Sequence, residues 1–355
     1  MKLISLFCWL SSVVSVHATP FQHSHLDFSI QGFAKDNPLG ETTGGKGGPT
    51  TTVSTLPALR TAIAGTNPLT IVAKGSFNLT DQPRLRLGSN KSLLGHKKGA
   101  KFFGGGISAI NQTNIIIRNV QISFAYDNDC ITLQNTTRAW IDHNEFFSDL
   151  EHGPDFYDGQ VDLVRATDWV TVSWNYFHDH WKVLSHTPEH QHKTLTENQQ
   201  SSLVGNSDAL REVDTGHLHI SYHHNHWSNI GTRGPAGRFG HQHIYNNLYT
   251  SFLYQAIHSR SDNQMLIEGN VFRGNTREAV SSYGLVIPED SPNTCVCGDF
   301  EIDGYVNFGA RNDWGGAGVN VTQWGTFRKA PYRYQLTRLG DVEEVVVKGA
   351  GIGKI

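Results

Sequence analysis

The sequence is poor in the features that mark several large classes of protein. Proline occurs 12 times against 36 glycines in 355 residues, which excludes a collagen-like chain. Charged residues make up 17% and the net charge is −3, so no basic surplus indicates nucleic-acid binding. Beyond the N-terminus, no apolar run reaches the roughly 18 residues that a membrane-spanning helix needs. We therefore expect a globular protein that binds neither nucleic acid nor membrane.

The first 18 residues are typical of a secretory signal peptide. Lys2 supplies a positive charge, residues 3–16 are mostly apolar, and small residues at the usual cleavage spacing end at Ala18. We expect cleavage after Ala18, a single mature domain over 19–355, and secretion.

Few cysteines remain after this cleavage. Cys130, Cys295 and Cys297 allow one disulfide and one free thiol, and the sequence leaves the pairing open. Five Asn-x-Ser/Thr sequences are candidates for glycosylation in a secreted protein; they are Asn78, Asn90, Asn111, Asn135 and Asn320.

A short β-branched or aromatic run containing asparagine recurs along the chain. The recurring asparagines are spaced by 25, 31, 50, 22 and 23 residues; they are Asn119, Asn144, Asn175, Asn225, Asn247 and Asn270. Each unit has room for one or two strands and none for a crossover helix. A period of this kind is typical of a parallel β-helix, with the asparagines stacked as a ladder. The alternative is an antiparallel sandwich in which asparagine only marks turns.

One short helix is predicted before the repeats begin. Ser54 or Thr55 can cap it, Pro57 falls in its first turn, and Leu59 and Ile63 share one face. We expect this helix to cap the coil.

Four aspartates lie near the strands of two successive repeats. Asp127 and Asp129 precede residues 131–133, and Asp158 and Asp162 precede residues 170–172. Alternate residues of a strand point the same way, and stacked strands lie about 4.8 Å apart, so these carboxylates can converge. Their repulsion favours a hard cation with oxygen ligands, which predicts Ca²⁺. The alternative is a set of independent, solvated acids.

Cationic residues form a second group. Arg233 and Arg238 flank a Pro- and Gly-containing loop, and Lys182 lies upstream after His178 and His180. Guanidinium groups match carboxylates, so acids for a metal beside cations indicate a polyanionic substrate whose carboxylates bridge the metal. For any single arginine, the alternative is a surface ion pair.

Three motifs carry a resemblance to a known family. They are Thr-Gly-Gly-Lys-Gly-Gly at 43–48, Ala-Trp-Ile-Asp-His at 139–143, and R-x-P-x-x-R-x-G at 233–240. Over nearly its whole mature length the chain resembles the secreted pectate lyases of polysaccharide lyase family one, especially the fungal branch. The resemblance implies an all-β, right-handed parallel β-helix. It also implies a monomeric enzyme that cleaves polygalacturonate by calcium-dependent β-elimination.

The resemblance also assigns roles to individual residues. The implied calcium ligands are Asp127, Asp129, Asp158 and Asp162, and Arg233 is the implied base that takes the C5 proton of the sugar. The implied substrate-binding residues are Lys182, Arg238, His180 and Arg260. Because a guanidinium is ordinarily protonated, an arginine base implies neighbouring cations and an alkaline pH optimum.

Some positions depart from the family pattern or fall outside its cleft. Asp158 is often glutamate in relatives, and Val164 with Arg165 beside it stands where bacterial relatives have a lysine. Asp142 and His143 resemble motif residues with a structural role away from the cleft. Other functions stay open: a pectin lyase that acts on methyl-esterified substrate without calcium, an inactive carbohydrate-binding β-helix, and a hydrolase on the same fold.

The longest interval between asparagines contains a polar segment at 183–200. Removing these 18 residues shortens the interval from 50 to 32 and joins Lys182 directly to Ser201, as in the family motif H-x-x-x-K-x-S-L-x-G. Its first and last codons can supply GT and AG, and a branch sequence fits at Leu195. We predict that this segment is a retained intron. The alternative is a native His-rich surface loop.

Overall fold

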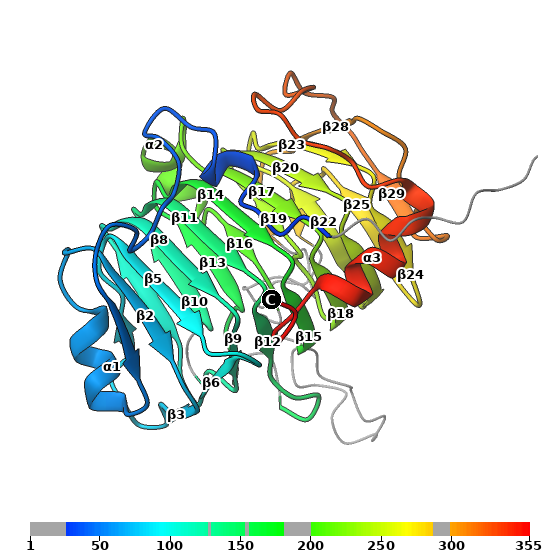
Figure 1. Ribbon diagram of the computed structural model, residues 1–355. Helices are drawn as coiled ribbons and strands as arrows, with labels where there is room; N and C mark the ends of the chain where they lie inside the picture. Colours follow the sequence, from blue (N-terminus) through cyan, green and yellow to red (C-terminus); the bar gives the residue numbers. More distant parts are fainter. Residues whose placement is uncertain (1–25, 127–128, 153–155, 181–199, 287–298) are drawn as a thin grey trace, which may run out of the picture.

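The computed structural model describes residues 26–126, 129–152, 156–180, 200–286 and 299–355 (Figure 1). Several predicted features lie outside these ranges: the signal peptide at 1–18, Asp127, Lys182, Cys295 and Cys297, and the segment 183–200 except for Gln200.

Three parallel sheets make up most of the regular secondary structure of the described residues, and successive strands of the chain pass from one sheet to the next (Figure 1). The ten-stranded sheet has the order β1 (Thr50–Val53), β2 (Leu69–Ala73), β5 (Lys91–Gly95), β8 (Thr113–Arg118), β11 (Thr137–Asp142), β14 (Asp168–Ser173), β17 (His219–His223), β20 (His241–Tyr245), β23 (Gln264–Glu268) and β28 (Tyr305–Phe308). The nine-stranded sheet has the order β4 (Leu85–Arg86), β7 (Ile107–Ile110), β10 (Ile131–Gln134), β13 (Val161–Val164), β16 (Leu203–Val204), β19 (Ala236–Gly237), β22 (Gln255–Ser259), β25 (Glu278–Ser281) and β29 (Gly318–Asn320). The eight-stranded sheet has the order β3 (Ser76–Asn78), β6 (Ala100–Phe103), β9 (Val120–Ser123), β12 (Glu145–Phe147), β15 (Tyr176–His180), β18 (His226–Ile230), β21 (Leu248–Phe252) and β24 (Val271–Arg273).

This arrangement is a right-handed parallel β-helix, so the predicted fold class is confirmed and the antiparallel sandwich is excluded. The one antiparallel sheet of the described ranges joins β26 (Leu285–Val286) to β27 (Asp299–Phe300).

The alternation of apolar residues explains the register between coils. In the ten-stranded sheet, Ile117, Ile141, Val172, Tyr222 and Ile244 stand in successive coils at paired positions, and all are fully buried. A slip of one residue would turn each of these side chains toward the outside, so burial holds the register. The interior is therefore a continuous apolar stack along the helix axis.

The predicted asparagine ladder is present. The Nδ2 of Asn144 donates to the Oδ1 of Asn175 at 3.0 Å, and the same bond repeats from coil to coil. The ladder contains Asn144, Asn175, Asn225, Asn247, Asn270 and Asn312.

The prediction for Asn119 was wrong. Its coil places Val120 at the ladder position, where the Val120 amide donates to Asn144, and Asn119 lies one residue earlier in a left-handed turn (φ 61°). Asn312 takes part instead, although the repeat in sequence ends at Asn270.

Helices cover one end and the outside of the coil. The predicted capping helix is α1 (Leu56–Ile63); Thr55 accepts a hydrogen bond from the Ala58 amide, and Leu59 and Ile63 are buried. Sequence analysis did not predict α3 (Val342–Gly349), which packs Val342 and Val346 on Leu248 of β21. The other helical segments are 3-10 turns at Gly32–Ala34, Asp208–Leu210 and Leu339–Asp341, and the single turn α2 (Arg211–Asp214).

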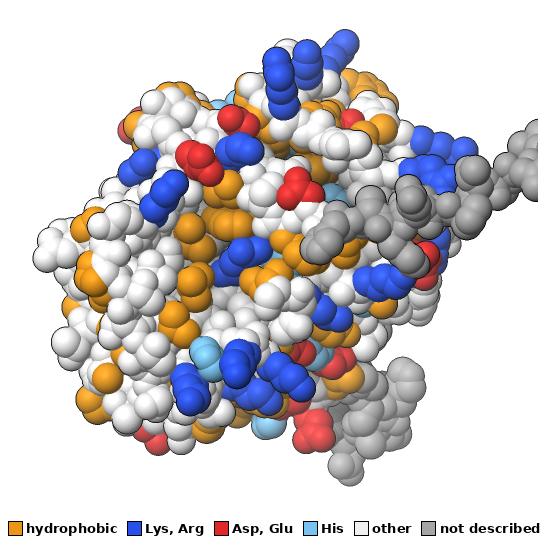
Figure 2. Space-filling model, in the orientation of Figure 1, with side chains coloured by type: hydrophobic (Ala, Val, Ile, Leu, Met, Phe, Trp, Pro, Cys, Tyr) orange, Lys and Arg blue, Asp and Glu red, His pale blue; other side chains and the backbone are white. Residues whose placement is uncertain are grey.

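The surface carries both signs of charge. On the face shown in Figure 2, Lys and Arg gather at the top and along the lower edge, Asp and Glu are scattered, and apolar surface lies between them. Within the described ranges, no helix is both long and apolar enough to cross a membrane. Cys130 is a buried free thiol inside the coil.

Candidate active site

Two of the predicted metal-binding aspartates converge on one backbone position. Strands β10 and β13 are neighbours in the nine-stranded sheet, with Thr132 paired to Asp162. The Gly159 amide donates to the Oδ1 of Asp129 at 3.0 Å. A Cβ added at Gly159 would lie 2.9 Å from the Oδ1 of Asp129 and 2.6 Å from that of Asp162. Only glycine therefore leaves room between the two carboxylates.

Like charge accumulates at this point. Burial raises the pKa of Asp129, and the charge of Asp158 raises it further. Burial raises the pKa of Asp162 as well, with the charges of Asp129 and Asp158 adding to the effect. Carboxylates that disfavour one another's charge are stabilised by a bound cation, and their oxygen atoms suit a hard cation.

The described aspartates fit a bound cation, but they do not form a full set of metal ligands by themselves. Among the residues that the structure describes, no group of three or more Asp, Glu, His or Cys side chains has metal-site geometry. The fourth predicted ligand, Asp127, lies outside those residues. The convergence of Asp129 and Asp162, with the charge of Asp158 close by, is the feature that fits a cation.

Sequence reasoning missed an arginine beside these acids. The Nη2 of Arg84 donates to the Thr132 hydroxyl at 2.6 Å and to the Asp129 carbonyl at 2.8 Å, and it lies 3.8 Å from the Asp129 carboxylate. Burial lowers the pKa of Arg84, and the charges of Asp129 and Asp162 oppose that effect. Arg84 offsets part of the negative charge. It comes from the turn before β4, two coils away, so no local motif indicated it.

Arg233 lies on the same sheet, in the turn before β19. It is 5% exposed and has a left-handed backbone (φ 61°), a costly conformation that is often found at active sites. Its Nη1 donates to the Oε1 of Gln200, and its charge partly offsets the raised pKa of Asp162. The predicted base therefore lies close to the acid cluster.

Gln200 is the second residue that the sequence did not indicate. It pairs with Thr232, and its side chain holds the Arg233 guanidinium. Sequence analysis had assigned Gln200 to the segment at 183–200.

Two of the predicted substrate-binding residues follow strands β19 and β22. Arg238 is 7% exposed and Arg260 is 1% exposed. Both pair with Glu301, which sequence reasoning also missed. Their neighbour His258 is neutral at pH 7, because burial and the charges of Arg260 and Arg233 lower its pKa to about 3.

His180 ends β15 and is buried. Its Nδ1 lies 2.8 Å from the Ser148 hydroxyl, and burial lowers its pKa to about 4. At neutral pH it can meet a substrate only as a hydrogen-bonding group, not as a cation. Lys182, the remaining predicted cation, lies outside the described residues.

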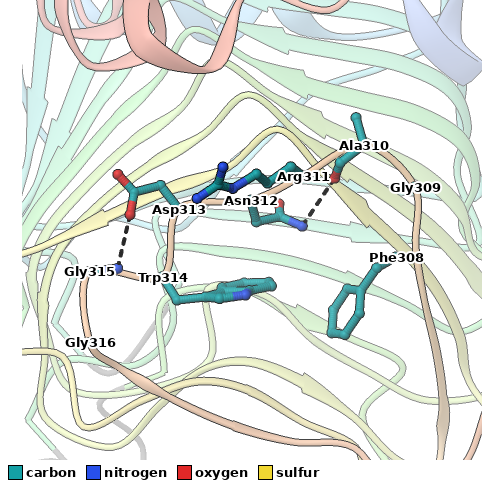
Figure 3. A pocket seen from close by; sticks show the side chains of 9 residues that line it. All are labelled: Phe308, Gly309, Ala310, Arg311, Asn312, Asp313, Trp314, Gly315 and Gly316. Atoms are coloured by element: carbon teal, nitrogen blue, oxygen red, sulfur yellow. Dashed lines mark hydrogen bonds between the residues drawn. The ribbon is translucent and has the colours of Figure 1, made fainter.

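A separate hollow of about 480 Å³ lies at the other end of the coil. Its walls come from residues 308–316, and the rings of Phe308 and Trp314 meet there edge to face, with 5.3 Å between their centroids (Figure 3). Both rings also pack on the apolar core, and Asn312 is the last member of the asparagine ladder. We interpret this hollow as part of the cap that ends the coil rather than as the active site.

Asp142 and His143 lie on the ten-stranded sheet, away from these groups. The Nδ1 of His143 is 2.6 Å from Asp142, whose carboxylate also accepts from Arg118 and Ser173. Groups of the chain itself thus surround the Asp142 carboxylate, whereas the buried Nε2 of His143 has no hydrogen-bond partner among the described residues.

Comparison with known proteins gives a consistent result. A family model described as pectate lyase matches residues 24–354. A probable pectate lyase B of Aspergillus flavus is 36% identical over 270 residues, which are 76% of this chain and 75% of that protein. Pectate lyase A of Aspergillus niger is 34% identical over 322 residues, 90% of this chain and 86% of that protein.

The fold comparison agrees with the sequence comparison. A pectate lyase from a Bacillus species, solved in complex with trigalacturonate, is 27% identical and superposes with a TM-score of 0.71. The match covers 92% of this chain and 99% of that one. Sequence and β-helix fold are thus shared with proteins of one kind, and the chain belongs to the pectate lyase family of polysaccharide lyases.

Proposed function

We propose that the protein is a secreted, calcium-dependent pectate lyase. It would cleave the α-1,4 bonds of polygalacturonate by β-elimination and release 4,5-unsaturated oligogalacturonides during plant cell-wall degradation. The observation that carries this proposal is the convergence of Asp129 and Asp162 beside Asp158, with Arg233 close to the same group. Secretion is supported by the signal-peptide pattern at 1–18.

The acids would hold calcium, and Arg233 would act on the sugar. Asp129, Asp158 and Asp162 would be ligands, together with Asp127. Bound calcium would neutralise the uronate carboxylate and so make the C5 proton more acidic. Arg233 would take that proton; the electron pair of the C5–H bond would form the C4–C5 double bond as the C4–O bond breaks. The leaving oxygen would take a proton from water.

The remaining contacts hold Arg233 in position. The amide of Arg233 donates to the Gln255 carbonyl at 3.0 Å, and its carbonyl accepts from the Ser202 amide at 2.7 Å. A buried, oriented base gains rate because its approach to the reacting proton is set before the reaction begins. This requires Arg233 to be neutral when it acts, so we expect activity to rise toward alkaline pH.

The test is release of the unsaturated product from polygalacturonate, followed by the ultraviolet absorbance of the new double bond. Activity with calcium and none after chelation supports the proposal. Product release that survives a chelator favours a pectin lyase. No product under any condition favours a carbohydrate-binding protein without catalysis.

Mass spectrometry of the N-terminus of protein collected from the medium tests secretion and cleavage after Ala18.

A further inference from the structure

Glu301 occupies the position on Arg238 where a carboxylate of the substrate would bind. Its Oε2 lies 3.1 Å from the Arg238 Nε and its Oε1 lies 2.5 Å from Nη2, which is a bidentate pair. The Nη1 of Arg238 donates to the Gly205 carbonyl at 2.7 Å. The forked edge of this guanidinium, which would match a uronate carboxylate, is therefore already used.

The same carboxylate also binds the next arginine along the sheet. The Nε of Arg260 lies 3.2 Å from the Oε2 of Glu301, and the Ser261 hydroxyl donates to that oxygen at 3.0 Å. Burial alone would raise the pKa of Glu301, but the charges of Arg260 and Arg238 lower it, so it is ionised at neutral pH. A second acid, Asp208, lies 3.7 Å from the Arg238 Nε.

This group lies beside the proposed catalytic residues. Ala236 of β19 pairs with Leu203 of β16 on one side and with His258 of β22 on the other. Arg233 precedes β19 and Arg238 follows it, so the two arginines lie at opposite ends of one short strand. The charge at Arg238 and Arg260 thus belongs to the region that a bound polymer would cross.

The net charge of this region decides whether it favours free galacturonate or its methyl ester. Two guanidiniums are offset by Glu301 and Asp208, so the pair presents no net positive charge to a substrate. A free uronate gains little there by comparison with its neutral methyl ester. An unoccupied arginine pair would instead favour the charged form.

We propose that Glu301 is a specificity-determining residue that makes the subsite at Arg238 tolerant of methyl-esterified galacturonate. The proposal rests on the proposed function and narrows its substrate to pectin that is partly esterified. The enzyme would bind galacturonate through calcium at the acid cluster and would accept an esterified residue at Arg238.

The test compares kcat and KM on polygalacturonate and on highly methyl-esterified pectin, for the wild type and Glu301→Gln. Removing the negative charge exposes the arginine pair. KM for polygalacturonate should then fall about fivefold, the size of one partly exposed charge interaction, with KM for esterified pectin unchanged. Glu301→Asp keeps the charge, so the ratio of KM for polygalacturonate to KM for esterified pectin should stay at the wild-type value. Glu278→Gln is the matched control, because Glu278 is a buried glutamate on the same sheet that bonds Tyr283 and Asn320.

A double variant keeps the proposal testable if Glu301→Gln does not fold. Arg238→Gln combined with Glu301→Gln removes both partners and leaves the net charge unchanged, so KM for polygalacturonate relative to KM for esterified pectin should stay within twofold of the wild-type ratio. A large rise in that ratio would show that Arg238 binds the substrate carboxylate in the wild type and would overturn the proposal. If Glu301→Gln changed KM equally for polygalacturonate and for esterified pectin, that result would overturn the proposal as well.

These outcomes are separate from a failure of the proposed function. Release of unsaturated product by the wild type with calcium tests the function. The role of Glu301 is tested only by how the ratio of the two KM values changes from the wild type to the variants. If no variant is active, calorimetry with trigalacturonate and its methyl ester measures the same ratio as a binding preference. Trigalacturonate should then gain affinity in Glu301→Gln, and its methyl ester should not; no gain overturns the proposal.

Discussion

Buried carboxylates occur on two faces of this coil, and their surroundings differ. On the ten-stranded sheet, Asp142 accepts hydrogen bonds from Arg118 and Ser173 and contacts His143, each at 2.6 Å. Beside the nine-stranded sheet, the carboxylates of Asp129 and Asp162 both approach Gly159. The two sheets belong to the same coil, so the difference comes from the groups that surround each carboxylate.

The pKa values follow this difference. Burial alone would raise the pKa of Glu268, on the ten-stranded sheet, but hydrogen bonds from His243, Tyr334 and the Ala310 amide lower it to about 2. For Asp129 and Asp162, burial and mutual repulsion together raise the pKa. Carboxylates that the chain itself neutralises stabilise the fold. Carboxylates that it leaves in excess are suited to a cation from outside.

The largest expected effect is on catalysis at the nine-stranded sheet, the active face. The ten-stranded sheet, which carries Asp142, is the structural face. Arg233→Lys should lower kcat by about 10²- to 10⁴-fold, since the base acts only in the transition state, and should change KM much less. Steady-state kinetics on polygalacturonate and a thermal unfolding curve measure both effects. Arg118→Lys is the control on the structural face and should lower the Tm while keeping kcat. A near-normal kcat in Arg233→Lys contradicts its role as the base.

The second effect separates the two kinds of carboxylate. Asp162→Asn should raise the calcium concentration needed for half-maximal activity about 10- to 100-fold. It should not lower the Tm of the calcium-free protein, because it relieves repulsion within the cluster. Asp158→Asn should shift the calcium requirement less. Calcium titrations of activity and of the Tm measure these shifts.

Asp142→Asn should give the opposite pattern. It leaves Arg118 without its ionised partner and should cost about 3 kcal/mol of stability, while the calcium requirement stays the same. Loss of stability in both Asp162→Asn and Asp142→Asn, with calcium dependence unchanged in both, would place the metal elsewhere.

A third effect concerns the segment at 183–200, for which the described residues His180 and Gln200 show where the chain leaves and re-enters the coil. His180 pairs with Ile230 and Gln200 pairs with Thr232. Nineteen residues separate His180 from Gln200, whereas one separates Ile230 from Thr232, so one coil exceeds the next by 18 residues. That surplus equals the length of the predicted intron. Its excision would bring Lys182 to the position of Gln200, beside Arg233.

We predict that the chain without these 18 residues is more active, by about tenfold or more, because a cation then stands next to the base. Its Tm should not fall. Sequencing of the transcript is the direct check. A peptide from the native secreted protein that spans the segment would refute the intron and favour the surface loop.

The smallest effect near neutral pH is a pH dependence of stability on the ten-stranded sheet. Burial lowers the pKa of His224 to about 3, and its Nε2 lies 2.9 Å from the Thr337 hydroxyl. The unfolded chain takes up this proton near pH 6.5 and the folded chain does not. Stability is therefore full above pH 6.5 and falls, by about 1 kcal/mol for each pH unit per histidine, as the pH decreases toward 3.

His224→Gln tests this dependence. The variant should have a lower Tm at pH 7 but a flatter profile of Tm against pH below 6.5. Parallel profiles for the wild type and the variant would contradict the burial of a neutral histidine. His152→Gln is the control, because this histidine is exposed.

Much of the architecture was readable from the sequence because a parallel coil converts a repeat along the chain into contacts in space. Residues one turn apart pair directly, so the spacing of Asn144, Asn175, Asn225 and Asn247 predicted a ladder that the structure contains. The same logic brought Asp129 and Asp162 together, since β10 and β13 belong to successive turns of the coil and pair in one sheet. The roles of Arg233 and of the aspartates came from motifs and are still predictions.

Tertiary structure alone decided the contacts that do not follow the repeat. Arg84 reaches Asp129 across 45 residues, and Glu301 reaches Arg238 across 63. A sequence read locally shows arginines that look available for substrate, but it cannot show which carboxylate returns from a distant loop to neutralise them. The period of the coil determines which strands pair. The net charge of the site depends on loops that have no period, and so it becomes visible only once the chain is folded.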